Sequence, residues 1–126
     1  MECYFGSLAL PEENELGKST VVMFTIPEIG ITFKAPFDAV DPDHSDLASL
    51  LALLEFIDSN QKYFTKHTYQ IYGNNLRIIN QVNQREQAPP IFSELLDRTK
   101  KYREKYRYSL EWVPSRDNSA YDSLLD

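Results

Sequence analysis

The sequence has few of the residues that build cysteine-rich, histidine-rich and membrane-spanning proteins. Its 126 residues include one cysteine, two histidines and four glycines. The lone Cys3 excludes an internal disulfide and a cysteine-rich zinc site, and two histidines argue against a histidine-rich metal centre. The longest apolar run, residues 47–57, is too short to cross a bilayer, and the first residues do not resemble a signal peptide. We therefore expect a cytoplasmic protein with no membrane partner.

What the sequence does contain is the composition of a globular domain. Hydrophobic residues make up 42% and charged residues 25%, and seven Phe and eight Tyr supply large side chains for a core. The length corresponds to one domain, and no repeat, low-complexity segment or internal boundary divides it. We therefore expect residues 1–126 to form a single domain.

Charge is distributed unevenly along the chain. The first 60 residues hold eleven of the nineteen acidic residues but only two of the thirteen basic ones. Six basic residues instead fall between positions 98 and 107. Because proteins that grip a phosphate backbone usually present a basic surface, this segment is a candidate nucleic-acid surface. A solvated helix face is the alternative interpretation.

The spacing of apolar residues predicts five strands and four helices in the order βββαβααβα. We place the strands at residues 3–10, 20–26, 31–37, 66–72 and 108–113, and helices at 47–57, 76–82, 91–106 and, briefly, up to Leu125. Asp43 or Ser45 is expected to cap the first helix, and Asn74 or Asn75 the second. Three closely connected strands favour an antiparallel meander. We thus expect an α/β fold with a five-stranded mixed sheet flanked by helices.

Three blocks of the sequence resemble motifs of ribonuclease H-like domains. Residues 71–83 (IYGNNLRIINQVN) resemble the segment in which an apolar strand ends in Asp-Ser and leads into a helix. Residues 112–125 (WVPSRDNSAYDSLL) resemble the closing motif, in which Val-Pro, Arg, Asn and Asp precede a leucine-bearing helix. Residues 45–54 (SDLASLLALL) resemble the helix that opens with Ala-Glu. Their order and spacing imply a ribonuclease H-like fold.

The resemblance also implies a metal site, because members of the family hydrolyse a phosphodiester with two divalent ions held by four carboxylates. Three of those positions correspond here to Asp46, Asn74 and Asp122. The first position, just before a Gly-Ser pair in the first strand, is Phe5. Two carboxylates offer little negative charge for two ions, so the resemblance predicts the fold without its usual activity. We expect no cofactor, or Mg²⁺ or Mn²⁺ if a nuclease site persists.

Three functions are compatible with these residues. In the first, the domain has lost metal-dependent nuclease activity and binds RNA, an RNA–DNA hybrid or another protein. In the second, it is a divergent nuclease that uses Asp46, Asn74 and Asp122, with a further carboxylate such as Asp43 or Asp126 recruited. In the third, it is an interaction protein whose fold merely imitates the family. We favour the first.

The nucleic-acid contacts expected for the first function come from the second helix start, the basic segment and the closing motif. They are Asn74, Asn75, Lys100, Lys101, Arg103 and Arg116. Each candidate also has an interpretation without function: the Asn residues as caps, Asp46 as a first-turn acid, and Arg116 in an ion pair. His44 and His67 are expected to be structural, and Trp112 to lie in the core.

Overall fold

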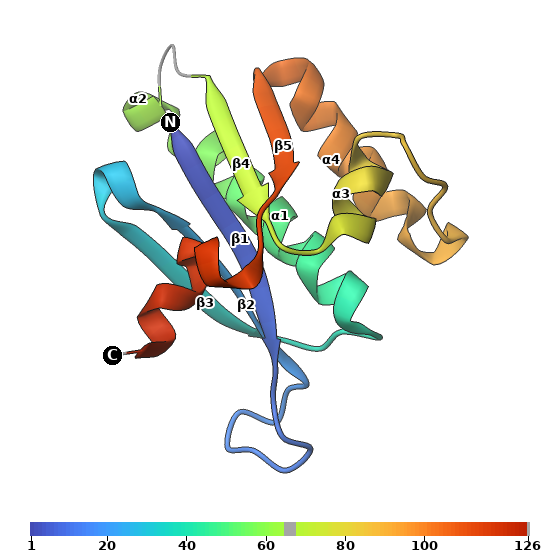
Figure 1. Cartoon of the computed structure of the whole chain (residues 1–126). Helices are drawn as coiled ribbons and strands as arrows, with labels where there is room; N and C mark the ends of the chain where they lie inside the picture. The colour runs from blue at the N-terminus through green and yellow to red at the C-terminus, as the bar shows by residue number, and fades with distance from the viewer. Residues whose placement is uncertain (65–67, 126) are drawn as a thin grey trace.

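The centre of the molecule is a five-stranded mixed sheet. The structure, a computed structural model, describes residues 1–64 and 68–125. The strands are β1 (Glu2–Ala9), β2 (Thr20–Ile26), β3 (Ile31–Phe37), β4 (Tyr69–Gly73) and β5 (Tyr108–Trp112). They lie in the order β3-β2-β1-β4-β5 (Figure 1). Strands β1, β2 and β3 pair antiparallel, whereas β4 pairs parallel with both β1 and β5. The predicted meander and mixed sheet are confirmed.

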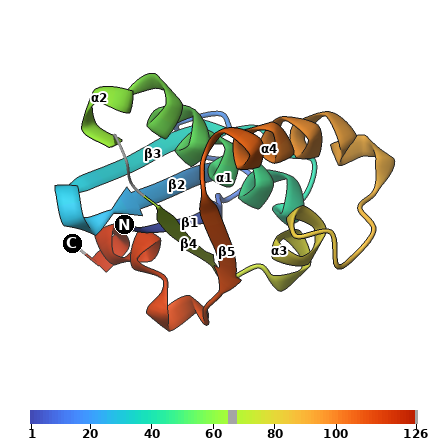
Figure 2. The same cartoon turned by 90° about the horizontal axis from the view of Figure 1, so that it is seen from above.

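Helices cover one face of this sheet, and short helical segments lie on the other. The helices are α1 (Pro42–Ser59), α2 (Gln61–Phe64), α3 (Leu76–Val82) and α4 (Ser93–Lys105). Four segments are 3-10 helices, namely η1 (Pro27–Ile29), η2 (Pro90–Phe92), η3 (Ser115–Asp117) and η4 (Ser119–Leu125). Figure 2 shows α1 and α4 on one side of the sheet and η3 and η4 on the opposite side. The last predicted helix is thus a 3-10 segment.

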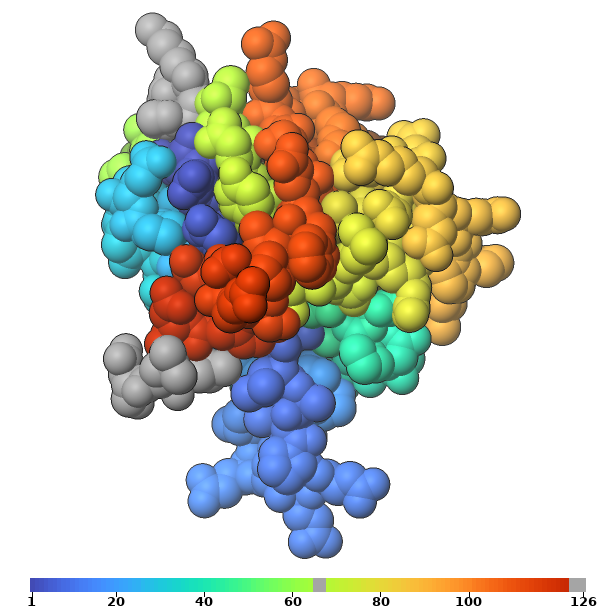
Figure 3. Space-filling view, in the orientation of Figure 1, coloured from blue at the N-terminus to red at the C-terminus, as the bar shows by residue number. Residues whose placement is uncertain are grey.

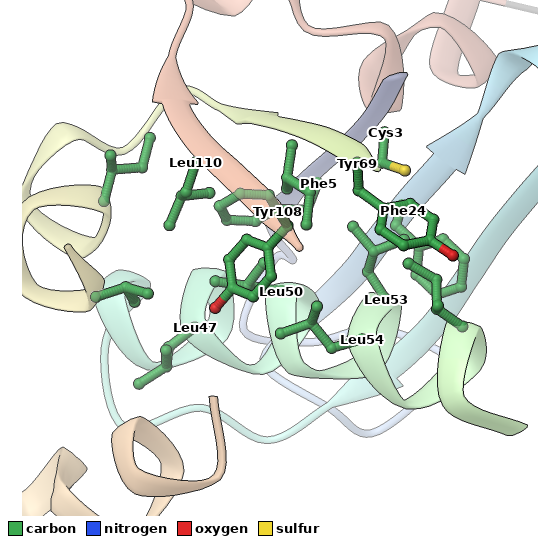
Figure 4. Close-up of a cluster of buried hydrophobic side chains, with 14 of the residues drawn as sticks. Cys3, Phe5, Phe24, Leu47, Leu50, Leu53, Leu54, Tyr69, Tyr108 and Leu110 are labelled. Atoms are coloured by element: carbon green, nitrogen blue, oxygen red, sulfur yellow. The ribbon is translucent and has the colours of Figure 1, made fainter. Parts of the chain in front are cut away.

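The core fills the space between the sheet and α1 (Figure 4). Alternate residues of β1, such as Cys3 and Phe5, point into it, as a pleated strand requires. Five large side chains of α1 meet them: Leu47, Leu50, Leu53, Leu54 and Ile57. Full burial of each contributes about 1.5–3 kcal/mol. Burial also raises the pKa of the Cys3 thiol to about 12, so this cysteine remains a protonated core residue.

The start of α1 differs from the prediction. The helix begins at Pro42 and is capped by Asp41, whose side chain accepts a hydrogen bond from the backbone N–H of His44 at 2.8 Å. The predicted caps Asp43 and Ser45 lie inside the helix instead. The reason is proline at the first helical position, where its fixed φ suits the helix and its missing N–H is not needed.

Three other local predictions are corrected. Trp112 is not in the core but 49% exposed, because it ends the edge strand β5. The helix predicted at 91–106 is divided into η2 and α4, and α2 was not predicted at all. The fourth strand begins at Tyr69; the first two residues predicted for it, 66 and 67, lie outside the described residues.

Candidate functional site

The residues that the family resemblance singles out surround the carboxyl end of β4. Four elements meet there: β1, the start of α1, the turn between β4 and α3, and the η3–η4 segment (Figure 1). In Figure 3, η3 and η4 (red) lie over the lower part of β1 (dark blue). We call this meeting point the junction. It brings together Phe5, Asp46, Asn74 and their immediate hydrogen-bond partners.

Asp46 is held by hydrogen bonds from two neighbouring elements. Its Oδ1 accepts from the hydroxyl of Ser7 at 2.6 Å, and its Oδ2 accepts from the Nδ2 of Asn75 at 2.8 Å. The same Nδ2 also donates to Asp43 at 2.9 Å. The Asn75 Oδ1 caps α3 by accepting from the backbone N–H of Ile78. Asn75, rather than Asn74, is therefore the cap of α3, and it connects that cap to the Asp46 carboxylate.

The environment of Asp46 acts on its charge in opposing directions. Burial raises the pKa of the Asp46 carboxyl, whereas the hydrogen bonds from Ser7 and Asn75 lower it. The nearby charge of Asp43 raises it further, although Asp43 itself pairs with Arg77 at 2.8 Å. Asp46 also lies in the second turn of α1, not the first turn as predicted, because the helix begins at Pro42. Its position therefore owes little to the helix dipole.

The first of the four implied ligand positions holds a buried phenyl ring. Phe5 is 1% exposed and belongs to the core. Its ring presses against Gly73, the last residue of β4, where an added Cβ would lie 2.5 Å from a ring carbon. The Phe5 ring thus occupies the position where the family resemblance implies a carboxylate ligand. Gly73, which has no side chain, leaves room for that ring.

Asn74, the third implied position, has both ends of its amide engaged. Its Nδ2 donates to the hydroxyl of Ser115 at 3.0 Å, and its Oδ1 accepts from the Nδ2 of Asn118 at 2.8 Å. Asn118 is 1% exposed, and its Nδ2 also donates to the carbonyl of Phe5 at 2.8 Å. The sequence identifies Asn118 only as part of the closing motif, and in the structure its Oδ1 also accepts from the backbone N–H of Ala120. Its link between β1 and β4 was missed.

Tyr121 completes the edge of β1, a role that no local pattern in the sequence indicates. Strand β4 pairs with β1 only as far as Tyr4. Beyond that point the Tyr121 hydroxyl accepts from the backbone N–H of Ser7 at 3.2 Å and donates to its carbonyl at 2.8 Å. A Cβ at Gly6 would lie 2.7 Å from this hydroxyl, so glycine there leaves the room for Tyr121. Burial raises the pKa of Tyr121.

The donors at the junction do not fit a two-ion centre. Asp122, the fourth implied position, is exposed on η4. Within residues 1–64 and 68–125, no three His, Cys, Asp or Glu side chains are grouped so that they could hold a metal ion. A pair of adjacent divalent cations needs clustered anionic oxygens, which the phenyl ring of Phe5 and the amide of Asn74 do not supply. Asp126, considered as a recruited carboxylate, lies outside the described residues.

Most of the basic segment, residues 98–105, lies in α4, and its charged side chains contact different neighbours. Arg98 pairs with Glu55 and Lys105 pairs with Asp58, both acids of α1, so part of the segment is neutralised. Arg103 turns the other way and lies over the ring of Tyr108. Of the other predicted contacts, Lys100 is half-buried and Lys101 exposed on α4, whereas Arg116 is exposed on η3 beside the junction.

His44 packs among aromatic side chains at the start of α1. His44 accepts a hydrogen bond on its Nδ1 from the backbone N–H of Val40 at 3.0 Å, and its ring packs against Phe37 and Phe92. These contacts agree with the structural role expected for it. His67 lies outside the described residues.

In the described part of the chain, no helix has the length and apolar character needed to span a membrane.

No protein-family model and no curated protein matches the chain. Solved structures do match. RNase H1 from the halophilic archaeon Halobacterium salinarum NRC-1 superposes with a TM-score of 0.74 at 14% identity, covering 98% of this chain and 92% of that one. The N-terminal RNase H domain of Rv2228c from Mycobacterium tuberculosis gives 0.76 at 12% identity, covering 96% and 87%. LC11-RNase H1, solved in complex with an RNA/DNA hybrid, gives 0.73 at 13% identity and 99% of each chain. The chain therefore has the ribonuclease H-like fold that its three sequence blocks implied.

Proposed function

We propose that this chain is a ribonuclease H-like domain that binds nucleic acid, RNA or an RNA–DNA hybrid, without hydrolysing it. The observation that carries the proposal is the contact between Phe5 and Gly73. It fills the first ligand position of the fold with a buried ring. Restoring an oxygen ligand there would require opening the core.

The remaining candidate ligands also argue against hydrolysis. Each oxygen of Asp46 already accepts a hydrogen bond, and bonds to a charged acceptor are worth roughly 1.5–3 kcal/mol each. The amide of Asn74 is committed to Ser115 and Asn118 and carries no charge. Recruiting these groups to a cation would break several of these bonds at once.

Binding is supported by the fold and by exposed donors beside the junction. LC11-RNase H1, whose structure superposes on 99% of this chain, was solved with an RNA/DNA hybrid. Arg116 on η3 is exposed, and Arg77 on α3 keeps 64% of its side chain accessible beside its ion pair with Asp43. Arginine is the usual partner of phosphate oxygens, and such contacts position a strand without reading its sequence. The net charge of −6 limits the affinity, and each arginine–phosphate contact that forms makes the affinity fall as salt rises.

The test measures binding of a fluorescent RNA–DNA hybrid over a series of salt concentrations. We expect the logarithm of the affinity to fall linearly with the logarithm of salt concentration. Arg116→Gln and Lys101→Gln should each reduce that slope by about one if the residue contacts a phosphate. Lys18→Gln is the matched control, because Lys18 pairs with Asp38 near the β1–β2 turn, away from the junction.

Cleavage of the same hybrid is measured in parallel with Mg²⁺ and with Mn²⁺. We expect no cleavage with either ion. A Mn²⁺-dependent activity that Asp122→Asn abolishes would establish the divergent nuclease instead. Absence of any salt-dependent binding would contradict the proposal and direct the search to a protein partner.

A further inference from the structure

A pocket of about 410 Å³ lies beside the junction, between α3, α4 and the outer edge of β5. These three elements are neighbours in Figures 1 and 2. Its volume falls within the range of small-molecule sites. The side chains that decide its chemistry come from all three elements and from the turn after α3. They are Asn80, Asn83, Arg85, Arg103, Glu111 and Trp112.

Arg103 is a preorganised cation in the wall of this pocket. Its Nη2 donates to the Oδ1 of Asn83 at 2.8 Å, and its Nη1 donates to the carbonyl of Val82 at 3.4 Å. The guanidinium carbon lies 4.5 Å from the centre of the Tyr108 ring. The Nε is buried and has no hydrogen-bond partner. A buried donor without a partner is unfavourable, so the other contacts of Arg103 must hold the side chain in this position.

A second arginine reaches the same pocket through the turn that ends α3. Gln84 has φ of 61°, the left-handed region that residues other than glycine seldom adopt. The turn lets the backbone N–H of Arg85 donate to the carbonyl of Asn80 at 2.8 Å, which ends α3 with Arg85 on the pocket wall. A left-handed residue just after a helix C-cap is a common way to end a helix, and here it fixes where Arg85 leaves α3.

The third element of the pocket is a flat aromatic surface. Trp112 is 49% exposed, and its indole N–H donates to the carbonyl of Asn74 at 3.2 Å. That bond fixes the ring and couples the pocket wall to the junction. Aromatic side chains of this kind stack on nucleobases. Glu111 also lines the pocket, so its lining holds two arginines and one acidic residue, and a carboxylate suits the amino group of a base.

We propose that this pocket binds a nucleotide, with the phosphoryl group at Arg85 and Arg103 and the base stacked on Trp112. The same chemistry is offered by a free mononucleotide and by a nucleotide unit of a bound strand. The first source is independent of the proposed function, and the second rests on it.

Trp112 is the only tryptophan in the sequence, so its fluorescence reports on the pocket directly. The experiment titrates adenosine monophosphate, adenosine and inorganic phosphate into the full chain and follows tryptophan emission. We expect the monophosphate to change the emission and to bind at least about tenfold more tightly than adenosine or phosphate, because it alone engages both ends of the pocket. Equal affinity for adenosine and its monophosphate would overturn the proposal, as would an unchanged emission.

Two matched variants separate the pocket from general charge. Arg85→Gln should weaken binding of the monophosphate by about tenfold, since it removes a charged donor from an exposed position. Arg107→Gln should leave the affinity unchanged, because Arg107 is exposed just before β5 and does not line the pocket. Urea unfolding of each variant checks that the fold is intact. An equal loss in both variants would refute recognition by the pocket.

Binding of the RNA–DNA hybrid by the same variants then distinguishes the two sources. If Arg85→Gln weakens the hybrid and the monophosphate together, the pocket takes a nucleotide unit of the strand. If it weakens the monophosphate alone, the pocket takes a free nucleotide. If the monophosphate binds and no hybrid does, the pocket stands and the proposed function fails. If the hybrid binds and the monophosphate does not, the proposed function stands and the pocket proposal fails.

Discussion

Replacing Gly73 by alanine will measure how tightly Phe5 fills the first ligand position. The added Cβ would lie 2.5, 2.6 and 3.1 Å from three carbons of the Phe5 ring, all closer than ordinary contact. The backbone at Gly73 is outside the left-handed region, so alanine brings no backbone strain. Overpacking typically destabilises by about 1–3 kcal/mol. Stiffening of the unfolded chain offsets about 0.4–1 kcal/mol. We therefore expect a net loss of about 1–2 kcal/mol in the free energy of unfolding.

The cause of that loss is isolated by a double-mutant cycle with Phe5→Leu. Phe5→Leu alone should cost roughly 1–2 kcal/mol, less than the 3–5 kcal/mol typical of truncating a buried Phe to alanine. In the double variant the new methyl group occupies space that the phenyl ring has left. The combined loss should therefore be smaller than the two single losses together, by about 1–2 kcal/mol. Urea unfolding followed by circular dichroism gives each free energy, with an unchanged dependence on denaturant as the check on two-state behaviour.

Gly30→Ala is the matched control for this cycle. Gly30 has φ of 66° with no atom within 4 Å of an added Cβ, so its substitution introduces backbone strain and no clash. It should cost about 1–2 kcal/mol and combine additively with Phe5→Leu. The reasoning is refuted if Gly73→Ala is equally additive, within about 0.5 kcal/mol, because Phe5 would then not be what limits the space.

Three further variants test the junction. Asn118→Ala should lower the free energy of unfolding by about 2–4 kcal/mol in urea, because two buried acceptors lose their donor. Tyr121→Phe should cost about 1–3 kcal/mol and speed hydrogen exchange of the Ser7 amide; unchanged exchange would contradict its role at the strand edge. Asp46 has a raised pKa, so the native state binds its proton first, and this group adds stability as pH falls from the folded toward the unfolded pKa. Asp46→Asn should remove that increment, and an identical pH dependence of unfolding in both proteins would disprove it.

Much of the fold could be predicted because its signals are local. The β-branched and aromatic residues of β2 and β3 mark both strands, and the structure gives the predicted bounds for each. The start of α1 could not be placed, because an acidic stretch containing Pro42 is typical of a loop as well as of a helix N-terminus. The length of a helix is thus less evident than its existence.

The candidate site was predicted only in the residues that its motifs contain. Asn74 or Asn75 was predicted as a cap because Asn is favoured just before a helix, and the structure assigns the role to Asn75, which accepts from the N–H of Ile78. Asn118 and Tyr121 donate to backbone carbonyls that lie 113 and 114 positions earlier in the chain. No local sequence pattern predicts hydrogen bonds over such a separation. The pocket at β5 was likewise invisible, since it depends on how three separate elements pack.

The closure of β1 by the last residues of the chain has a consequence for synthesis on the ribosome. Strands β1, β2 and β3 emerge first and can pair with one another through short turns. The other edge of β1 must wait for β4 and then for Asn118 and Tyr121. A nascent chain that lacks these residues carries a sheet edge with unpaired backbone groups, the kind of surface that invites aggregation and chaperone binding. Removal of the chain from Asn118 onward should therefore destabilise β1, because the strand loses its hydrogen bonds to Asn118 and Tyr121.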